Sequence, residues 1–260
     1  MVGPQTHIAM KKQLFLGALV AVALNLLPAS AQPGPRGPRF DASMSKLFGE
    51  NTAFSAALDF QTKDKTTGDT MGMPGKLAYL EGKVRFEMDM TQMRSASIPP
   101  EAAEGMKAMG MGNIIIISRP DKKLAYMIYP GMKAYTENET KDIEDLKASD
   151  KFKLEATELG KETVAGHPCV KNKVVVTDDK GVKHESTVWN ATDLKQFPVK
   201  IEANENDTPM TMLFKDIKLA KPDAAQFEPP KDLKRYDNMQ ALMQEEMMKR
   251  MGGAGGLPQR

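Results

Sequence analysis

Cysteine is almost absent from this chain of 260 residues, which contains only Cys169. One cysteine cannot form an internal disulfide, so the fold must depend on a hydrophobic core. Histidine is also rare, and neither His167 nor His184 stands in a recognisable nucleophile, triad or metalloprotease pattern. No glycine-rich phosphate loop follows a predicted strand. These absences predict a protein that is not an enzyme, with no catalytic residue, no bound metal and no cofactor.

An excess of positive charge is lacking as well. The chain has 36 Lys and Arg against 34 Asp and Glu, and no run of basic residues is longer than a pair. A protein that binds nucleic acid has to neutralise several phosphates and needs a basic patch to do so. We therefore expect no nucleic-acid partner.

Long hydrophobic runs are absent except for residues 14–27, which follow Lys11 and Lys12 and precede the small residues Ala29, Ser30 and Ala31. This pattern is typical of a secretory signal peptide over residues 1–31, cleaved after Ala31. The mature chain then has no transmembrane segment and no cysteine for lipid attachment at its start. A single cysteine favours the bacterial periplasm as its location.

Composition divides the remaining chain into four parts. Residues 32–50 are a leader rich in Pro and Gly, whose first eight residues cannot form a regular strand. Residues 51–235 are the β domain. Residues 236–251 are expected to form a Met-rich amphipathic helix, and residues 252–260 a disordered tail.

Side chains in the β domain alternate between apolar and polar. Phe54, Leu58 and Phe60 alternate with smaller or polar residues, and Val84 and Phe86 alternate with charged ones, which predicts half-buried strands. Further strands are predicted at residues 113–118, 123–129, 152–159, 170–177, 182–190, 197–204 and 210–219. Many short strands in series predict a mainly β (α+β) fold, with a curved antiparallel sheet or incomplete β-barrel packed on two or three helices.

For one predicted hairpin, the sequence also predicts which residues face each other across the two strands. If a turn at Asp178–Gly181 joins two strands, Thr177 faces Val182, Val175 faces His184, Val170 faces Trp189 and Cys169 faces Asn190. Val175 and Cys169 are then about 20 Å apart along the strand. His184 cannot share a metal ion with Cys169 in this register.

Three helices have start signals. Pro99, Pro100 and Glu101 begin the first, because proline suits a position without an amide partner and an acid suits the positive helix end. Thr140 caps the second, which presents Ile143 and Leu146. A capping box of Asp237 and Gln240 begins the third, and Gly252 ends it. Its apolar stripe consists of Met239, Leu242, Met243, Met247 and Met251.

Several segments together resemble a bacterial periplasmic family of unknown function (domain of unknown function 4412) within the LolA/LolB-like lipoprotein-carrier fold. The resemblance covers about residues 51–236. It is carried by residues 82–88, 114–118, 121–130, 133–135, 166–169, 188–190, 197–200 and 223–230. It implies an incomplete barrel around helices, whose apolar interior shelters the acyl chains of a lipoprotein. It also implies that Arg85 is similar in position to an arginine that latches the lid of the cavity.

The alternation and the resemblance together predict a hydrophobic cavity for a lipid, an acyl chain or a lipoprotein, in a protein that is a monomer. The predicted cavity residues are Phe54, Leu58, Phe60, Val84, Phe86, Met88, Met90, Met210, Met212 and Phe214. The predicted lid is the glycine-interrupted segment that carries Met106, Met109 and Met111.

Methionine is unusually frequent, with 20 in the chain, and leaves two further interpretations open. Clusters such as Met71/Met73 and Met88/Met90/Met93 contain soft thioethers that could bind Cu(I), although methionine also fills irregular apolar space. Alternatively, the C-terminal helix is an interaction module that inserts its Met face into a partner's groove.

Overall fold

One mixed sheet contains all the named strands of the described residues. The computed structural model describes residue 40 and residues 42–63, 67–96, 99–139, 151–205 and 208–253. The strands are β1 (Ala53–Lys63), β2 (Thr70–Leu80), β3 (Lys83–Asp89), β4 (Asn113–Arg119), β5 (Leu124–Tyr129), β6 (Ala134–Glu139), β7 (Lys153–Val164), β8 (His167–Thr177), β9 (Lys183–Ala191), β10 (Phe197–Glu205), β11 (Thr208–Lys218) and β12 (Lys234–Tyr236).

The helices are few and short. The described residues contain α2 (Ala42–Leu47), α3 (Pro100–Ala108) and α4 (Met239–Gly253), with the 3₁₀ turns η1 (Met90–Gln92), η2 (Pro120–Lys122), η3 (Pro130–Met132) and η5 (Ala224–Phe227). None of these helices is long and apolar enough to cross a membrane. The predicted signal peptide and the predicted helix at Thr140, Ile143 and Leu146 lie outside the described residues.

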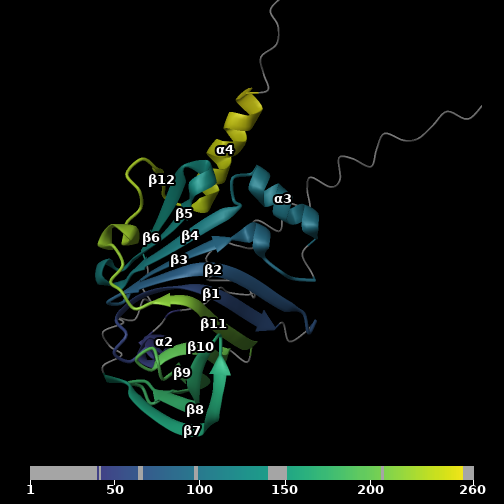
Figure 1. The fold of residues 1–260 in the computed structure, drawn as a ribbon. Coiled ribbons are helices and arrows are strands. Elements are labelled where there is room, and N and C mark those ends of the chain that lie inside the picture. The colour runs from purple at the N-terminus through teal and green to yellow at the C-terminus, as the bar shows by residue number, and fades with distance from the viewer. Residues whose placement is uncertain are drawn as a thin grey trace, which may run out of the picture. The chain divides into compact units, whose positions relative to one another are not determined.

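The strand order is β12-β6-β5-β4-β3-β2-β1-β11-β10-β9-β8-β7, so the sheet is open and has β12 and β7 at its edges (Figure 1). Every neighbouring pair is antiparallel except β12 and β6, which are parallel. The prediction of a mainly β, open antiparallel fold is confirmed.

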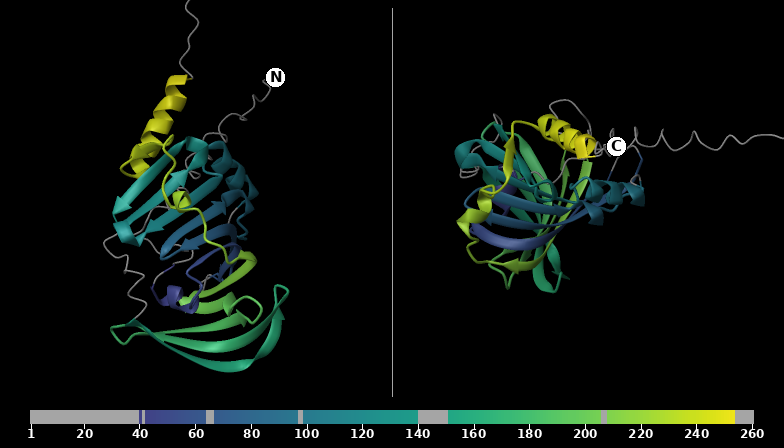
Figure 2. Two further views of the ribbon diagram at one scale, coloured as in Figure 1. Left: turned by 60° about the vertical axis from the view of Figure 1, so that its left-hand side comes forward. Right: turned by 90° about the horizontal axis from the view of Figure 1, so that it is seen from above.

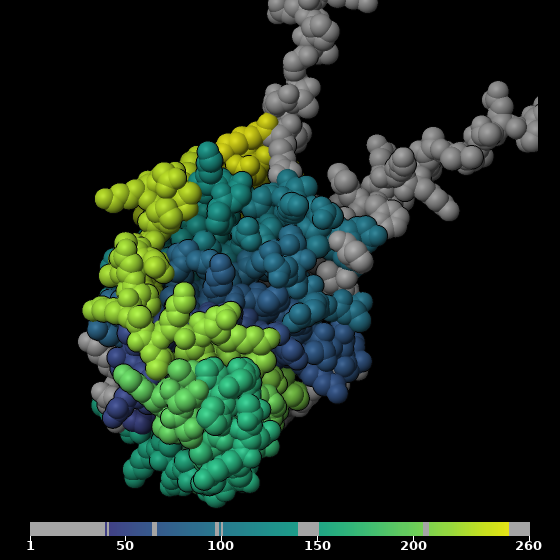
Figure 3. All heavy atoms as spheres, in the orientation of Figure 1, coloured from purple at the N-terminus to yellow at the C-terminus, as the bar shows by residue number. Residues whose placement is uncertain are grey.

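The alternation along β1 and β3 gives the sheet two distinct faces. Phe54, Leu58 and Phe60 are buried on one face, and Ser55 and Ala57 point to the other. We call the first the helix face, because α2 packs on it. We call the second the strap face, because residues 219–233 (the strap), between β11 and β12, cross it. The strap is the yellow-green segment in front of the strands in Figure 2 and lies across the blue atoms of the strands in Figure 3.

Gly75 marks a close approach on the helix face. A Cβ added at this position would lie 2.6 Å from the ring of Phe86 and 2.5 Å from the carbonyl oxygen of Glu87. Phe86 on β3 therefore packs against the bare backbone of β2. This packing explains why β2 contains a glycine in its middle.

Helix α2 lies within the segment predicted as a leader and was not anticipated by the residue pattern. The ring of Phe48, just after α2, lies 4.8 Å from that of Phe54, 5.9 Å from Tyr79, 5.6 Å from Phe197 and 5.8 Å from Phe214. Such pairs gain free energy beyond the burial of their area. α2 is thus held on the helix face by one aromatic cluster.

The predicted register of the β8–β9 hairpin is wrong by one residue. Thr177 faces Lys183 and not Val182, and Cys169 faces Ala191 and not Asn190. The carboxylate of Asp178 accepts hydrogen bonds from the amides of Lys180 and Val182, which closes a turn one residue longer than expected. Trp189 accordingly faces Lys171 instead of Val170, and His184 faces Val176 instead of Val175.

The predicted start of α3 is confirmed, with Pro99 as its cap and Glu101 in its first turn. The predicted capping box of α4 is wrong. The side chain of Asn238, and not of Asp237, accepts the hydrogen bond from the amide of Ala241. α4 ends at Gly253, one residue beyond the predicted stop.

Candidate binding surfaces on the two faces of the sheet

Nine of the ten predicted cavity residues occupy strand positions on the helix face, the tenth, Met90, lies in η1, and all of them are buried. Leu58 pairs with Phe214 and Phe60 with Met212 across β1 and β11. Side chains of paired residues in neighbouring strands lie on the same face. The helix face therefore carries a continuous apolar surface, which in this structure is covered.

An opening remains beside α2. A cavity of about 160 Å³ lies between Met44 and Leu47 of this helix and the sheet residues Ala203 and Met210. His184 and Lys183 stand at the same cavity. The helix face is therefore accessible next to α2, at the part of the sheet formed by β8 to β11.

The predicted lid lies at a different corner of the sheet. Met111 is 1% exposed, Met106 is also buried and Met109 is half-buried. A Cβ added at Gly131 would meet the backbone of Gly110 at 2.5 Å, so the end of this segment packs closely against η3. The three methionines line neither of the two described cavities, and their role as a lid stays a prediction.

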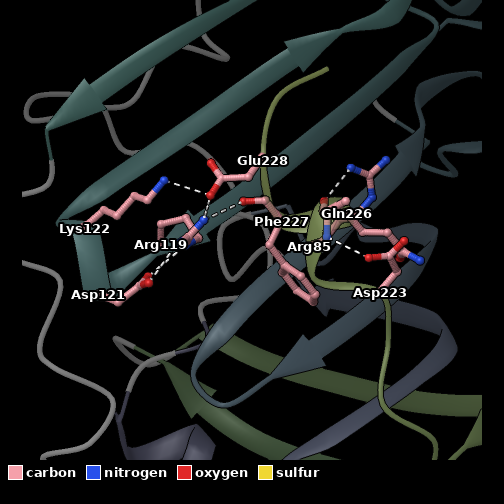
Figure 4. Close-up of polar contacts among 9 residues, drawn as sticks. Arg85, Arg119, Asp121, Lys122, Asp223, Gln226, Phe227 and Glu228 are labelled. Carbon is pink, nitrogen blue, oxygen red and sulfur yellow. Dashed lines mark hydrogen bonds and ion pairs between the residues drawn. The ribbon is translucent and has the colours of Figure 1, made fainter. Parts of the chain in front are cut away.

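Arg85 points to the strap face, away from the predicted cavity residues. Its Nε donates to Glu87 at 2.8 Å. Its Nη1 donates to the carbonyl oxygen of Gln226 in the strap at 3.0 Å (Figure 4). In this structure, Arg85 thus holds the strap. The family resemblance instead predicts a contact between Arg85 and a lid over the apolar cavity.

A second arginine clamps the strap, and no local pattern in the sequence indicates it. Buried Arg119 bonds both carboxylate oxygens of Asp121, the carboxylate of Glu228 and the carbonyl oxygen of Phe227 (Figure 4). Lys122 adds an ion pair to Glu228 at 2.8 Å. The hydrogen bonds to carboxylates raise the pKa of Arg119. The strap is therefore tied to the end of β4 by charge-assisted hydrogen bonds.

Phe227 anchors the strap between these arginines. It is fully buried against Ala78, Leu80, Ile117 and Tyr126, among others on the strap face. The strap face therefore has a small apolar core of its own, which depends on one aromatic side chain from the strap.

The Arg119 clamp should make stability fall in acid. The hydrogen bond from Arg119 lowers the pKa of Asp121. Burial opposes the same effect at Glu228, but hydrogen bonds from Lys122 and Arg119 still lower its pKa. Groups with a lowered pKa contribute stability above their unfolded pKa, near 4, and that contribution is lost as pH falls through the folded pKa.

We expect denaturant unfolding to show this loss below about pH 4. The double variant Asp121→Asn/Glu228→Gln should flatten the acid slope. Asp193→Asn, which removes the exposed partner of His167, is the control and should leave the acid slope little changed. An unchanged slope in the double variant would contradict the clamp.

The other candidate residues occupy structural positions. His167 contacts Asp193 at 2.9 Å, and the Cys169 thiol donates to the carbonyl oxygen of His167. Trp189 is buried, and its indole nitrogen donates a hydrogen bond to the carboxylate of Glu162. The ammonium groups of Lys171 and Lys200 lie over its ring. Within the described ranges, no cluster of three His, Cys, Asp or Glu residues is arranged to hold a metal ion.

The C-terminal helix leaves the end of its predicted stripe exposed at Met247. Leu242 is fully buried, while Met247 is 56% exposed and Met248, outside the predicted stripe, is 58% exposed. Lys234 ties the helix to β12 through Glu245, at 2.6 Å. Figure 2 shows α4 extending beyond the ends of the strands.

The fold and its two faces define a class of protein: an open, mainly β sheet with an apolar face under a short helix. The family model described as "Domain of unknown function (DUF4412)" matches residues 67–196, which is half of the chain. The chain belongs to this family, as the sequence resemblance predicts. No curated protein matches the chain.

Solved structures with a similar fold include a LolA superfamily protein from Nitrosomonas europaea (8% identity, TM-score 0.38, 72% of this chain and 94% of that chain). The Mycobacterium tuberculosis lipoprotein LppX has 11% identity and a TM-score of 0.37, over 74% and 97% of the two chains. A Pseudomonas aeruginosa MucA/MucB complex has 13% identity and a TM-score of 0.33, over 74% and 62%. The chain thus spans less than two thirds of that last protein. These are likenesses of fold alone.

Proposed function

We propose that this protein is a non-enzymatic, periplasmic binding protein for an acyl chain or a lipidated segment, which lies on the helix face when α2 moves aside. One observation carries the proposal. A continuous apolar surface runs across the sheet, and a helix of only six residues packs on part of it.

The apolar surface extends across the sheet from β3 to β10. The pairings Phe86–Leu77, Leu58–Phe214 and Met212–Ile201 place these buried side chains on one face. Burial of a methylene contributes about 0.8 kcal/mol, so about ten methylenes of an acyl chain would contribute about 8 kcal/mol. Binding of this kind needs no polar group in the site.

The cover is a single short helix that is followed by an aromatic anchor, Phe48. A helix as short as α2 is not stable on its own in water. Ser45 of α2 shares a hydrogen bond with the hydroxyl of Tyr79 at 2.7 Å. Ala42, Met44 and Leu47 of the helix are buried, and Phe48 adds ring contacts just after it. α2 can therefore be exchanged for another apolar group at moderate cost.

The cavity beside α2 is smaller than a usual ligand site, so a ligand fits there only if α2 moves. The cavity beside α2 measures about 160 Å³, whereas sites for small ligands usually measure about 300–1,000 Å³. An acyl chain would enter at this cavity and displace α2 as it moves along the sheet. Met44, Met210 and Met212 around this path are flexible enough to repack.

The experiment compares two alanines on opposite faces. Ala203 lines the cavity beside α2, and Ala57 lines a cavity on the strap face. Ala203→Trp should fill the entry and abolish uptake of cis-parinaric acid, measured by its fluorescence. Ala57→Trp should leave uptake unchanged, because it fills the other face. Absence of uptake by the unaltered protein, or equal uptake by both variants, would contradict the proposal.

A further inference from the structure

A second cavity, of about 320 Å³, opens on the strap face between β1, β2, β3, β11 and the strap. Ser55 and Ala78 form part of its floor and face each other across β1 and β2. The same row continues to Lys218 on one side and Arg85 on the other. One long cationic side chain thus lies at each end of a floor of small residues.

The next row of the cavity repeats this arrangement. Lys76 lies between Ala57 on β1 and Glu87 on β3. Within the described part of the chain, neither Lys76 nor Lys218 has an ion-pair partner. Arg85 keeps one bond to Glu87 and one to the strap carbonyl of Gln226. Within the described residues, the cavity therefore holds two lysines without an ion pair, together with Glu87, which pairs with Arg85.

An irregular piece of β11 completes the cavity. Ser55 pairs with Lys218, but Ala57 pairs with Lys215, so the ladder bulges at Asp216. Asp216 has φ +50°, a left-handed conformation that is unfavourable for a residue with a side chain. Bulges of this kind reorient a side chain and often lie beside functional sites. Here the bulge brings a carboxylate to the cavity that contains the lysines.

We infer that this cavity binds a small phosphate ester that carries an amine. Lys76, Lys218 and the Nη2 group of Arg85 would hold the phosphate, because several cations together recognise its several oxygens. Asp216 would hold the ammonium group. The small residues of the floor leave room for the short linker between the two charges.

The chemistry fits two sources, the free aminoalkyl phosphate and the headgroup of a phospholipid. The inference does not rest on the proposed function, because this cavity and the apolar surface lie on opposite faces of the sheet.

The test is a titration of the full chain with O-phosphoethanolamine, followed by amide chemical shifts. We expect saturable shifts at β1, β2 and β11. Lys218→Gln and Lys76→Gln, both on exposed side chains, should each weaken binding at least tenfold. Ala57→Trp should abolish it by filling the floor. Lys173→Gln, an exposed lysine away from the cavity, is the matched control and should bind normally, as should Ala203→Trp.

Vesicles of phosphatidylethanolamine then separate the two sources. Flotation with the vesicles that is lost in Lys218→Gln assigns a lipid headgroup, whereas binding of the soluble compound alone assigns a free ligand. Shifts that do not saturate at millimolar concentration would overturn the inference. Binding unaffected by Lys218→Gln and Ala57→Trp would overturn it too.

Discussion

Phe48→Ala should lower the free energy of unfolding by about 3–5 kcal/mol and, at the same time, raise the affinity for a fatty acid. Phe48 is 2% exposed, and its ring contacts five other rings. Its loss leaves a cavity and removes the main attachment of α2. If α2 and the acyl chain compete for one surface, as we propose, weakening α2 favours the ligand.

Urea unfolding and cis-parinaric acid titration of the same preparation would measure both effects. Phe48→Leu, which keeps most of the apolar volume, should show smaller changes in the same directions. Lower stability together with weaker fatty-acid binding would mean that α2 belongs to the binding surface and does not cover it.

Phe227→Ala should destabilise the protein by a similar amount, about 3–5 kcal/mol, but leave fatty-acid affinity unchanged. Phe227 is fully buried on the strap face, among Ala78, Leu80 and Ile117. Its loss should release the strap between the two arginines. The helix face on the other side of β2 would keep both α2 and its apolar side chains.

The two substitutions form a matched pair, since each removes one buried phenylalanine that anchors a segment to the same sheet. Unfolding and fatty-acid titration under the same conditions would compare them. If Phe227→Ala raised the affinity as much as Phe48→Ala, general loosening would explain the gain and not the removal of α2.

Alternation along the chain predicts most of the sheet, because strands with one buried face repeat every two residues. β1 and β3 show this clearly. β2 does not, since Gly72, Pro74 and Gly75 interrupt its pattern. These residues have poor intrinsic preference for strands, and only tertiary contacts, such as that of Phe86 with Gly75, explain them.

The elements that sequence reasoning missed depend on contacts distant in the chain. α2 is too short to show a helical period, and its position depends on Phe54 and Phe197. The bond from Arg119 to the carbonyl oxygen of Phe227 spans 108 residues. The hairpin register depended on one side chain, Asp178, which adds a residue to the turn.

The candidate sites were predictable to different degrees. Burial of the apolar residues on the helix face follows from their alternation, and the same alternation puts Arg85 on the opposite face from Val84 and Phe86. The cavity of the strap face depends on the bulge at Asp216 and on the path of the strap. Neither of these leaves a local signal in the sequence.

Amide hydrogen exchange with and without a bound fatty acid tests the central claim most directly. If the ligand takes the place of α2, exchange should become faster over residues 42–50 and slower in β1, β10 and β11, with the strap unchanged. Unchanged or slower exchange over residues 42–50 in the saturated protein would contradict the displacement of α2 from the helix face.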